Sequence, residues 1–323
     1  MPTLTVNGHT YHCLADETVL DTLLREQVAI AYSCKKGSCQ SCLVQSQNAP
    51  PPEQAQTGLK NTLKHQHYFL ACQCYPEQDM ALKLPDPAAF YTVGTVVTAA
   101  ALNKNTRQIV LSLDAAFNFK PGQYVNLQRP DGLTRCYSIA NTPQPSPLLE
   151  FHIRRLDNGR FSTWLHDEIK VGDTLAVSEA HGHCFYLPER TGQGLLLVGT
   201  GTGLAPLAGI LADALALGHD GPIYLFHGSR TADDLYYIDA MRQLSQQHPN
   251  FHYFPCLSGQ PIPEGFSAGR AHDVALATLP ELKGWRVYLC GHPDMVAQMR
   301  RMAFLKGASM QDIYTDAFVL SAR

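Results

Sequence analysis

The chain has 323 residues, 45% of them hydrophobic and 16% charged, and a formal net charge of −3 at pH 7. A chain of this length predicts two or three domains, and its composition excludes a collagenous or low-complexity protein. The charge balance provides no basic field, so we do not expect nucleic acid as a partner.

The N-terminus and the cysteines bear on the compartment. The first residues, MPTLTVNGHTYHC, lack a basic region followed by an apolar core, so we expect no secretory signal. Ten cysteines without such a signal indicate reduced thiols and metal ligands in the cytoplasm.

Residues 1–87 form the first predicted segment. Its first elements are expected in the order strand, strand, helix, at residues 3–6, 10–13 and 18–27. Asn7-Gly8 between the two strands is a strong signal for a type I′ hairpin, and Thr18 begins a capping-box-like helix start. The two prolines of residues 84–89, LPDPAA, predict a linker to the next segment.

Three cysteines stand close together in AYSCKKGSCQSCLV, and a fourth follows in YFLACQC. Cys34, Cys39 and Cys42 are separated by four and then two residues, and Cys72 follows after twenty-nine more. This spacing is typical of a plant-type 2Fe–2S loop, in which four thiolates hold two irons. The alternatives are a zinc site, which usually brings two C-x-x-C-like pairs, or buried cysteines without metal. We predict a 2Fe–2S cluster, and the resemblance of residues 1–87 to plant-type ferredoxins implies a β-grasp fold.

Residues 90–190 form a second, strand-rich segment. Strands are predicted at residues 93–98, 108–113, 124–128, 136–139, 149–153 and 174–177, with one helix at 160–168. Many short strands with regular turn signals predict a small antiparallel barrel or a sandwich.

Residues 191–323 form the third segment, in which apolar strands alternate with helical stretches. Strands are predicted at residues 195–198, 223–226, 252–254, 287–290 and 313–315. This alternation predicts an α/β domain with a parallel sheet and helices on both faces. Residues 194–218 are apolar enough to span a membrane, but their glycine cluster, Pro206 and Asp213 favour a buried strand, a loop and a helix instead.

Two strings of the barrel segment suggest a cofactor site. RCYSIAN at residues 135–141 places Arg135 and Tyr137 on one face of a strand, which a half-buried strand would also do without any ligand. GRFST at residues 159–163 opens a helix, and a helix N-terminus with a free hydroxyl can bind an anion. Together they would suit a cofactor with a pyrophosphate and an aromatic head group.

Three strings of the third segment end predicted strands. GTGTGLAP at residues 199–206 departs from the GxGxxG fingerprint at Leu204, yet its glycines still let a pyrophosphate approach a helix N-terminus. FHGSR at residues 226–230 and LCGHP at residues 289–293 end two other strands. Ligands of open α/β sheets bind outside the carboxyl ends of the strands, so all three strings fall at the expected edge.

In their order, these five strings closely resemble the ferredoxin–NADP⁺ reductase superfamily over about residues 90–323. Joined to a ferredoxin segment, the chain resembles the three-domain reductase components of bacterial oxygenases, such as the benzoate dioxygenase and soluble methane monooxygenase reductases. The resemblance implies a 2Fe–2S ferredoxin domain at 1–87, an FAD-binding barrel at 90–190 and an NAD(H)-binding α/β domain at 191–323.

The resemblance also implies roles for individual residues. It assigns Arg135 to the FAD pyrophosphate, Tyr137 and Ser138 to the isoalloxazine, Cys290 to the nicotinamide, and Phe318 to the segment that covers the flavin. We expect Ser138, Cys290 and Phe318 to act in hydride transfer, although Cys290 has a buried core thiol as its alternative. The other residues expected to bind FAD or NADH are His152, Gly159, Phe161, Ser162, Thr163, Gly199, Thr200, Gly201, Thr202, Gly203, Pro206, Gly228, Ser229, Arg230, Gly291 and Asp316.

The charge near HGSR bears on the coenzyme. Asp233 and Asp234 should repel a 2′-phosphate, whereas Arg230 would attract one. We predict a preference for NADH over NADPH.

The predicted activity is electron transfer from NADH through FAD to the 2Fe–2S cluster, and from there to a Rieske-type or di-iron oxygenase, by a monomeric protein. The alternatives are a free flavin or ferric reductase and a reductase for a deoxysugar dehydrase. A carrier or sensor that uses only the cluster is disfavoured by the intact RCYSIAN and GTGTGLAP strings.

Overall fold

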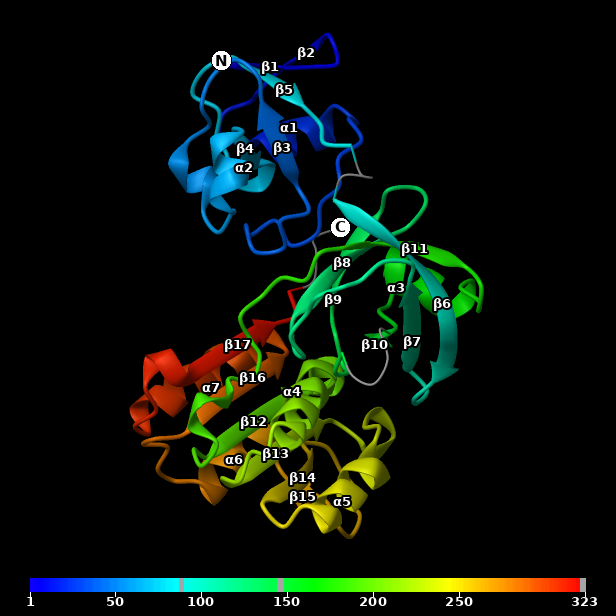
Figure 1. Ribbon diagram of the computed structural model, residues 1–323, viewed down its shortest axis with the longest axis vertical. Coiled ribbons are helices and arrows are strands. Elements are labelled where there is room, and N and C mark those ends of the chain that lie inside the picture. The colour runs from blue at the N-terminus through cyan, green and yellow to red at the C-terminus, as the bar shows by residue number, and fades with distance from the viewer. Residues whose placement is uncertain (87–89, 144–147, 320–323) are drawn as a thin grey trace.

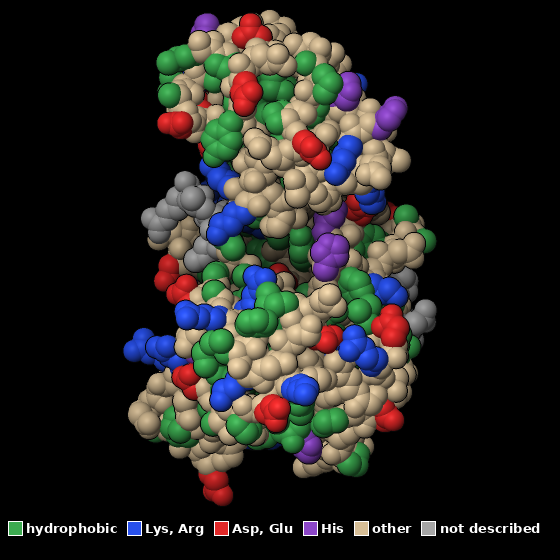
Figure 2. All heavy atoms as spheres, turned by 90° about the vertical axis from the view of Figure 1, so that its left-hand side faces the viewer, with side chains coloured by type: hydrophobic (Ala, Val, Ile, Leu, Met, Phe, Trp, Pro, Cys, Tyr) green, Lys and Arg blue, Asp and Glu red, His purple; other side chains and the backbone are tan. Residues whose placement is uncertain are grey.

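The structure is a computed structural model that describes residues 1–86, 90–143 and 148–319. Three domains follow one another along the long axis of the molecule, in the order of the chain (Figure 1). The linker predicted at residues 84–89 lies partly outside the described residues, and residues 84–86 are neither helix nor strand. On the face shown in Figure 2, acidic and basic side chains are interspersed.

The N-terminal domain is a mixed five-stranded sheet with the strand order β2-β1-β5-β3-β4, in which β1 and β5 are parallel. Its elements are β1 (Thr3–Val6), β2 (His9–His12), α1 (Val19–Arg25), β3 (Leu43–Ser46), α2 (Asn61–His65), β4 (Tyr68–Leu70) and β5 (Met80–Lys83). Asn7 and Gly8 have φ of 50° and 81°, as a type I′ turn requires, and Thr18 forms the predicted capping box with Asp21.

The middle domain is a six-stranded antiparallel sheet with the strand order β10-β7-β6-β11-β8-β9. Its elements are β6 (Tyr91–Ala101), β7 (Thr106–Leu113), β8 (Tyr124–Gln128), β9 (Thr134–Ser138), β10 (Leu148–Arg154), α3 (Arg160–Asp167) and β11 (Thr174–Ser178). The amide of Ala140, just after β9, donates to the carbonyl of Glu150 on β10 at 2.8 Å, so the two edges of the sheet approach each other. The predicted antiparallel barrel is confirmed.

The C-terminal domain is a parallel sheet with the strand order β15-β14-β13-β12-β16-β17. Its strands are β12 (Leu195–Thr200), β13 (Ile223–Ser229), β14 (Phe251–Leu257), β15 (Ser267–Ala268), β16 (Arg286–Gly291) and β17 (Ile313–Ala317). Its helices are α4 (Leu204–Ala216), α5 (Ile238–Gln247), α6 (Ala271–Thr278) and α7 (Pro293–Leu305). The strand order reverses between β12 and β16, and a ligand crevice is expected at such a switch point.

The apolar stretch at residues 194–218 divides into β12 and α4, as predicted. Along β12, Leu195 and Leu197 pack into the core on one face of the sheet, whereas Leu196 and Val198 pack into the core on the other. A strand covered on both faces reads as a continuous apolar run, which explains the resemblance to a membrane span. Within the described residues, no helix has both the length and the apolar character to cross a bilayer.

Candidate functional site

The four cysteines of the predicted cluster form two pairs in the ferredoxin domain. The amide of Cys39 donates to Cys34 Sγ and the amide of Cys34 donates to Cys39 Sγ, both at 3.4 Å. A hydrogen bond between the thiols of Cys42 and Cys72 raises the pKa of Cys42 and lowers that of Cys72 to about 7. Two thiolate pairs suit a cluster in which each of two irons takes two protein ligands.

Donors from the loop around residues 34–41 point at the same sulfurs. The amide of Lys36 and the hydroxyl of Ser38 donate to Cys34 Sγ at 3.3 and 3.4 Å, and Ser41 Oγ lies 3.3 Å from Cys39 Sγ. Gly37 has φ of +79°, and a Cβ there would lie 2.9 Å from the side chain of Gln73. The loop therefore needs glycine at this position in order to bring its amides close to the sulfurs.

The donor set fits a 2Fe–2S cluster. Such a cluster binds two pairs of thiolates and accepts hydrogen bonds at its sulfurs, as the amides of Lys36 and Cys39 and the hydroxyl of Ser38 would provide. Cys34, Cys39, Cys42 and Cys72 would be its ligands.

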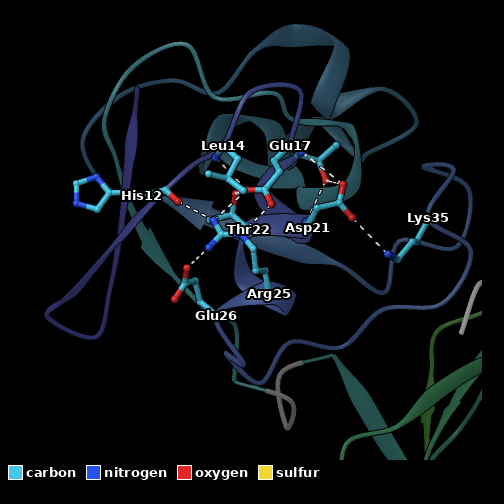
Figure 3. Close-up of polar contacts among 9 residues, drawn as sticks. His12, Leu14, Glu17, Asp21, Thr22, Arg25, Glu26 and Lys35 are labelled. Atoms are coloured by element: carbon cyan, nitrogen blue, oxygen red, sulfur yellow. Dashed lines mark hydrogen bonds and ion pairs between the residues drawn. The ribbon is translucent and has the colours of Figure 1, made fainter.

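Helix α1 anchors the cluster loop through a surface ion-pair network (Figure 3). Lys35 Nζ lies 3.3 Å from Asp21 Oδ1, so this lysine is paired within the ferredoxin domain, while Lys36 is exposed. Arg25 donates to Glu17 at 2.8 Å and to the carbonyl of His12 at 2.7 Å. The Arg25 hydrogen bond lowers the pKa of Glu17 to about 2. The network ties β2, α1 and the cluster loop together.

The predicted FAD residues gather where β9 meets α3. Arg135 and Tyr137 are half-buried on β9, and the ring of Tyr137 lies 5.8 Å from that of Phe161 on α3. The Ser162 hydroxyl is not free, because it donates to the carbonyl of Gly159 at 3.2 Å and accepts from the amide of residue 156 at 3.1 Å. Arg135 and the first amides of α3 remain the groups suited to a pyrophosphate.

Ser138 and Asp316 connect the barrel to the parallel sheet. Ser138 Oγ, at the end of β9, donates to Asp316 Oδ2, at the end of β17, at 2.6 Å. Burial raises the pKa of Asp316 from its usual 3.8 to about 6, although the bond from Ser138 acts in the opposite direction. A hydroxyl and a carboxyl of this kind can hold a proton at the junction of the two domains. Phe318 follows two residues later, and its amide donates to the carbonyl of Gly291 at 2.8 Å.

The glycine-rich loop and Cys290 lie at the switch point. A Cβ on Gly203 would lie 2.2 Å from the carbonyl oxygen of Cys290, so the loop after β12 packs directly on the end of β16. Cys290 is fully buried, and its Sγ lies 3.8 Å from Cys184 Sγ. Thr200 Oγ1 accepts from the amide of His292 at 3.0 Å and further ties the two strand ends together. Gly203 is therefore required here by close backbone packing.

His152 lies in a buried polar network between the barrel and the nucleotide domain. Its ring nitrogens lie 2.8 Å from Glu150 Oε1 and 3.0 Å from the hydroxyl of Tyr236. Tyr237 and Gln108 also donate to Glu150, at 3.0 and 2.8 Å. Both ring nitrogens of His152 therefore have partners within the protein.

Sequence reasoning missed the residues that hold the domains together. Asn126 on β8 and Cys136 on β9 contact the cluster loop, and Glu150 on β10 contacts the nucleotide domain. Each reads as an ordinary residue of an alternating strand, and no local motif marks it. Asn126 differs from its neighbours on the strand because it is a polar residue at a buried position. Its burial is seen in the structure but cannot be read from the sequence.

Comparison with protein families supports this division of the chain. The 2Fe-2S iron-sulfur cluster binding domain matches residues 4–77, the oxidoreductase FAD-binding domain matches residues 94–186, and the oxidoreductase NAD-binding domain matches residues 197–301. The fold and the site thus define an iron–sulfur flavoprotein oxidoreductase that uses FAD, a 2Fe–2S cluster and a nicotinamide coenzyme.

Individual relatives match over nearly the whole chain. The reductase component of the naphthalene 1,2-dioxygenase system of Pseudomonas putida is 33% identical over 94% of both chains. The reductase subunit of an aromatic O-demethylase from Amycolatopsis is 34% identical over 91% of both. The crystal structure of an Amycolatopsis cytochrome P450 reductase superposes with a TM-score of 0.71 at 31% identity, covering 98% of this chain and 99% of that one. The chain belongs to this family of three-domain reductase components.

Proposed function

We propose that this protein delivers electrons from NADH to a separate oxygenase, and that it does so as a monomer in the cytoplasm. The relatives named above are reductase components of dioxygenase and demethylase systems, which supports an oxygenase as the acceptor. Rieske-type and di-iron oxygenases are both compatible with this route as acceptors.

The observation that carries this proposal is the serial arrangement of the three sites within one chain. Gly203 and Cys290 meet at the switch point of the nucleotide domain, and Ser138 and Asp316 join that domain to the barrel. On β9, two residues before Ser138, Cys136 Sγ lies 3.3 Å from Ser33 Oγ, and Ser33 is next to the predicted cluster ligand Cys34. No second copy of the chain is needed to complete this route, which supports a monomer.

When bound, FAD accepts a hydride and the cluster carries single electrons, so the redox chemistry belongs to the cofactors. The chain binds and orients them: Arg135 and the α3 N-terminus would hold the pyrophosphate, and Tyr137 would pack on the flavin ring. Asp316 and Ser138 would hold a proton beside the ring, and the four cysteines would hold the cluster.

The test is coupled turnover. The purified protein should oxidise NADH in step with product formation by an oxygenase encoded next to it, and free FAD should not replace that oxygenase as the preferred acceptor. Faster reduction of free flavin than of any oxygenase, unchanged by loss of the cluster, would establish the free flavin reductase instead. Light scattering after size-exclusion chromatography should give the mass of one chain, 35.6 kDa.

The coenzyme preference for NADH is also part of this proposal. Asp233 is exposed after β13, and Asp234 lies 3.6 Å from Lys104 Nζ and accepts from Thr231 at 2.8 Å. One carboxylate is therefore partly neutralised, while the other remains open to repel a 2′-phosphate. Equal kcat/KM values for NADPH and NADH would contradict the preference.

A further inference from the structure

The cluster loop docks on the barrel through one buried side chain, Asn126 of β8. Its Nδ2 donates to the carbonyl of Cys39 at 2.8 Å, and its Oδ1 accepts from Ser41 Oγ at 2.8 Å. Asn126 is 1% exposed and Ser41 is 8% exposed. Because a buried amide is costly to leave unpaired, these bonds favour one position of the loop on the barrel.

The barrel in turn fixes Asn126. The backbone amide of Asn126 donates to Ser178 Oγ on β11 at 2.9 Å, and Ser178 donates onward to the carbonyl of Glu179 at 2.8 Å. Asn126 therefore joins the sheet of the barrel to the loop that carries three of the four predicted cluster ligands, Cys34, Cys39 and Cys42.

Asn126 also competes for a proton at a cluster sulfur. Ser41 has a single hydroxyl proton, and its oxygen lies 2.8 Å from Asn126 Oδ1 and 3.3 Å from Cys39 Sγ. The shorter contact favours the amide, which leaves the sulfur without this hydrogen bond. Hydrogen bonds to cluster sulfurs help to set the reduction potential, because they stabilise the more negative, reduced cluster.

Cys136 extends the same contact toward the flavin residues. It lies on β9 between Arg135 and Tyr137, and its side chain leaves the strand on the opposite face from theirs. Cys136 Sγ lies 3.0 Å from Asn126 Oδ1 and 3.3 Å from Ser33 Oγ. Strand β9, which is predicted to bind the flavin, thus contacts the cluster loop through Cys136, the residue between Arg135 and Tyr137.

Away from Asn126, the ring of Phe90 packs 5.8 Å from that of Tyr68, and further polar contacts lie at the rim of this interface. The Tyr124 hydroxyl donates to the carbonyl of Ser38 at 2.8 Å, and Lys60 Nζ lies 2.6 Å from Glu179 Oε2 with both side chains more than half exposed. Such exposed ion pairs contribute little. A cavity of about 760 Å³ opens beside Asn126 between the two domains, so packing elsewhere in the interface is incomplete.

We propose that Asn126 is the positioning residue for electron transfer from the flavin barrel to the cluster: it holds the Cys39 side of the loop against β8 and β9 and withholds the Ser41 proton from the Cys39 sulfur. The inference deepens the proposed function, since it assumes that electrons pass from the barrel to the cluster. Asn126 acts through the loop and does not itself touch substrate.

The test compares Asn126→Ala with wild type in the fully loaded protein. Flavin reduction by NADH should be unchanged, while the following reduction of the cluster should slow by about tenfold or more, the scale on which loss of orientation acts.

The midpoint potential of the cluster, measured by EPR titration, should rise in Asn126→Ala because Ser41 is released to the Cys39 sulfur. Ser41→Ala should leave the potential unchanged, because Cys39 Sγ receives no hydrogen bond from Ser41 in the wild type. Hydrogen exchange of the loop amides at residues 38–41 should become faster in Asn126→Ala.

Two matched controls should behave as wild type. Gln128→Ala removes another amide of β8, whose bonds remain within the barrel, and Lys60→Ala removes the exposed ion pair of the same interface. If Asn126→Ala does not load its cofactors, Ser41→Ala should show a smaller slowing of cluster reduction, since it removes one of the two bonds between Asn126 and the loop.

Unchanged cluster reduction and unchanged loop exchange in Asn126→Ala would overturn the inference. The same would follow if Ser41→Ala, used in place of an unloaded Asn126→Ala, reduced its cluster at the wild-type rate with unchanged loop exchange. A wild-type protein whose cluster NADH never reduces would instead contradict the proposed function, so the two failures are distinguishable.

Discussion

The barrel meets its two neighbours through very different interfaces. Toward the nucleotide domain it presents Glu150, whose carboxylate is bonded by Gln108, His152 and Tyr237, and the ring of His152 packs edge-on against Tyr236 at 5.1 Å. Toward the ferredoxin domain it presents Asn126, an exposed ion pair and a cavity of about 760 Å³.

The difference follows from what each junction would transmit. Hydride transfer needs two rings held in a fixed geometry, so the two domains that hold them are joined by a dense, buried polar network. An electron needs proximity but no covalent step, so one buried amide and a few rim contacts can suffice at the cluster. The predictions below separate the two junctions, from the largest expected effect to the smallest.

Replacing Cys39 with alanine should affect only the ferredoxin side. The variant loses one of four thiolates, so it should not assemble the cluster, and reduction of a one-electron protein acceptor should be abolished. The flavin should still be reduced by NADH, because the nucleotide junction is intact. Normal reduction of a protein acceptor such as cytochrome c would show that electrons leave by another route.

Replacing Gly203 with alanine should affect only the reduction of the flavin by NADH. Its Cβ would lie 2.2 Å from the carbonyl oxygen of Cys290, so the end of β16 must shift. We expect flavin reduction by NADH to slow by about a hundredfold, as a displacement near 1 Å can cause, while the absorption of the cluster is retained. Gly192→Ala is the matched control, because its φ is not positive and a Cβ there would meet only Asp220 Oδ1, at an ordinary 3.8 Å. Equal flavin reduction in the two variants would refute the close packing at the switch point.

Replacing Glu150 with alanine should destabilise the junction of the barrel and the nucleotide domain. Burial alone would raise the pKa of Glu150, but hydrogen bonds from His152, Gln108 and Tyr237 lower it overall, so the carboxylate is charged in the folded protein. Its removal leaves the buried Nε2 of His152 without a partner, while Gln108 and Tyr237 keep their bond to each other, and we expect a loss of about 2 kcal/mol in urea unfolding. Glu168→Ala, an exposed site at the end of α3, should change stability by less than about 0.5 kcal/mol.

The pH dependence of stability should report the raised pKa of Asp316. The folded protein holds this proton up to about pH 6, whereas the unfolded chain releases it near 3.8, so the contribution of Asp316 to stability falls as pH rises through that window. Without FAD, wild type should lose about 2 kcal/mol relative to Asp316→Asn between pH 4 and pH 7, a value reduced for partial exposure. A difference that stays constant with pH would contradict the assignment.

Local signals predicted much of this fold. The Thr18 capping box, the Asn7-Gly8 turn and the apolar strand before the glycine-rich loop depend on neighbours in sequence, and each appears in the structure. Strand β6 was expected at residues 93–98 but spans Tyr91–Ala101, because a bulge between Val96 and Thr98 interrupts the two-residue alternation.

The domain junctions could not be predicted in the same way. Asn126 and its partner Ser41 are 85 residues apart, and Ser138 and Asp316 are 178 residues apart. An isolated polar residue in a strand is normally assigned to the solvent face, so the sequence offers no signal that Asn126 is buried or that Glu150 is half-buried. Motifs predicted the cofactor residues, whereas the contacts that order these residues in space required the structure.

The most direct test of the serial route is an anaerobic stopped-flow experiment on the wild-type protein mixed with NADH. Flavin absorbance should fall first, at a rate that rises with NADH concentration. The cluster signal should follow at a rate independent of both NADH and protein concentration, as expected for transfer within one docked chain. A cluster phase without a lag behind the flavin, or one that accelerates with protein concentration, would contradict the account.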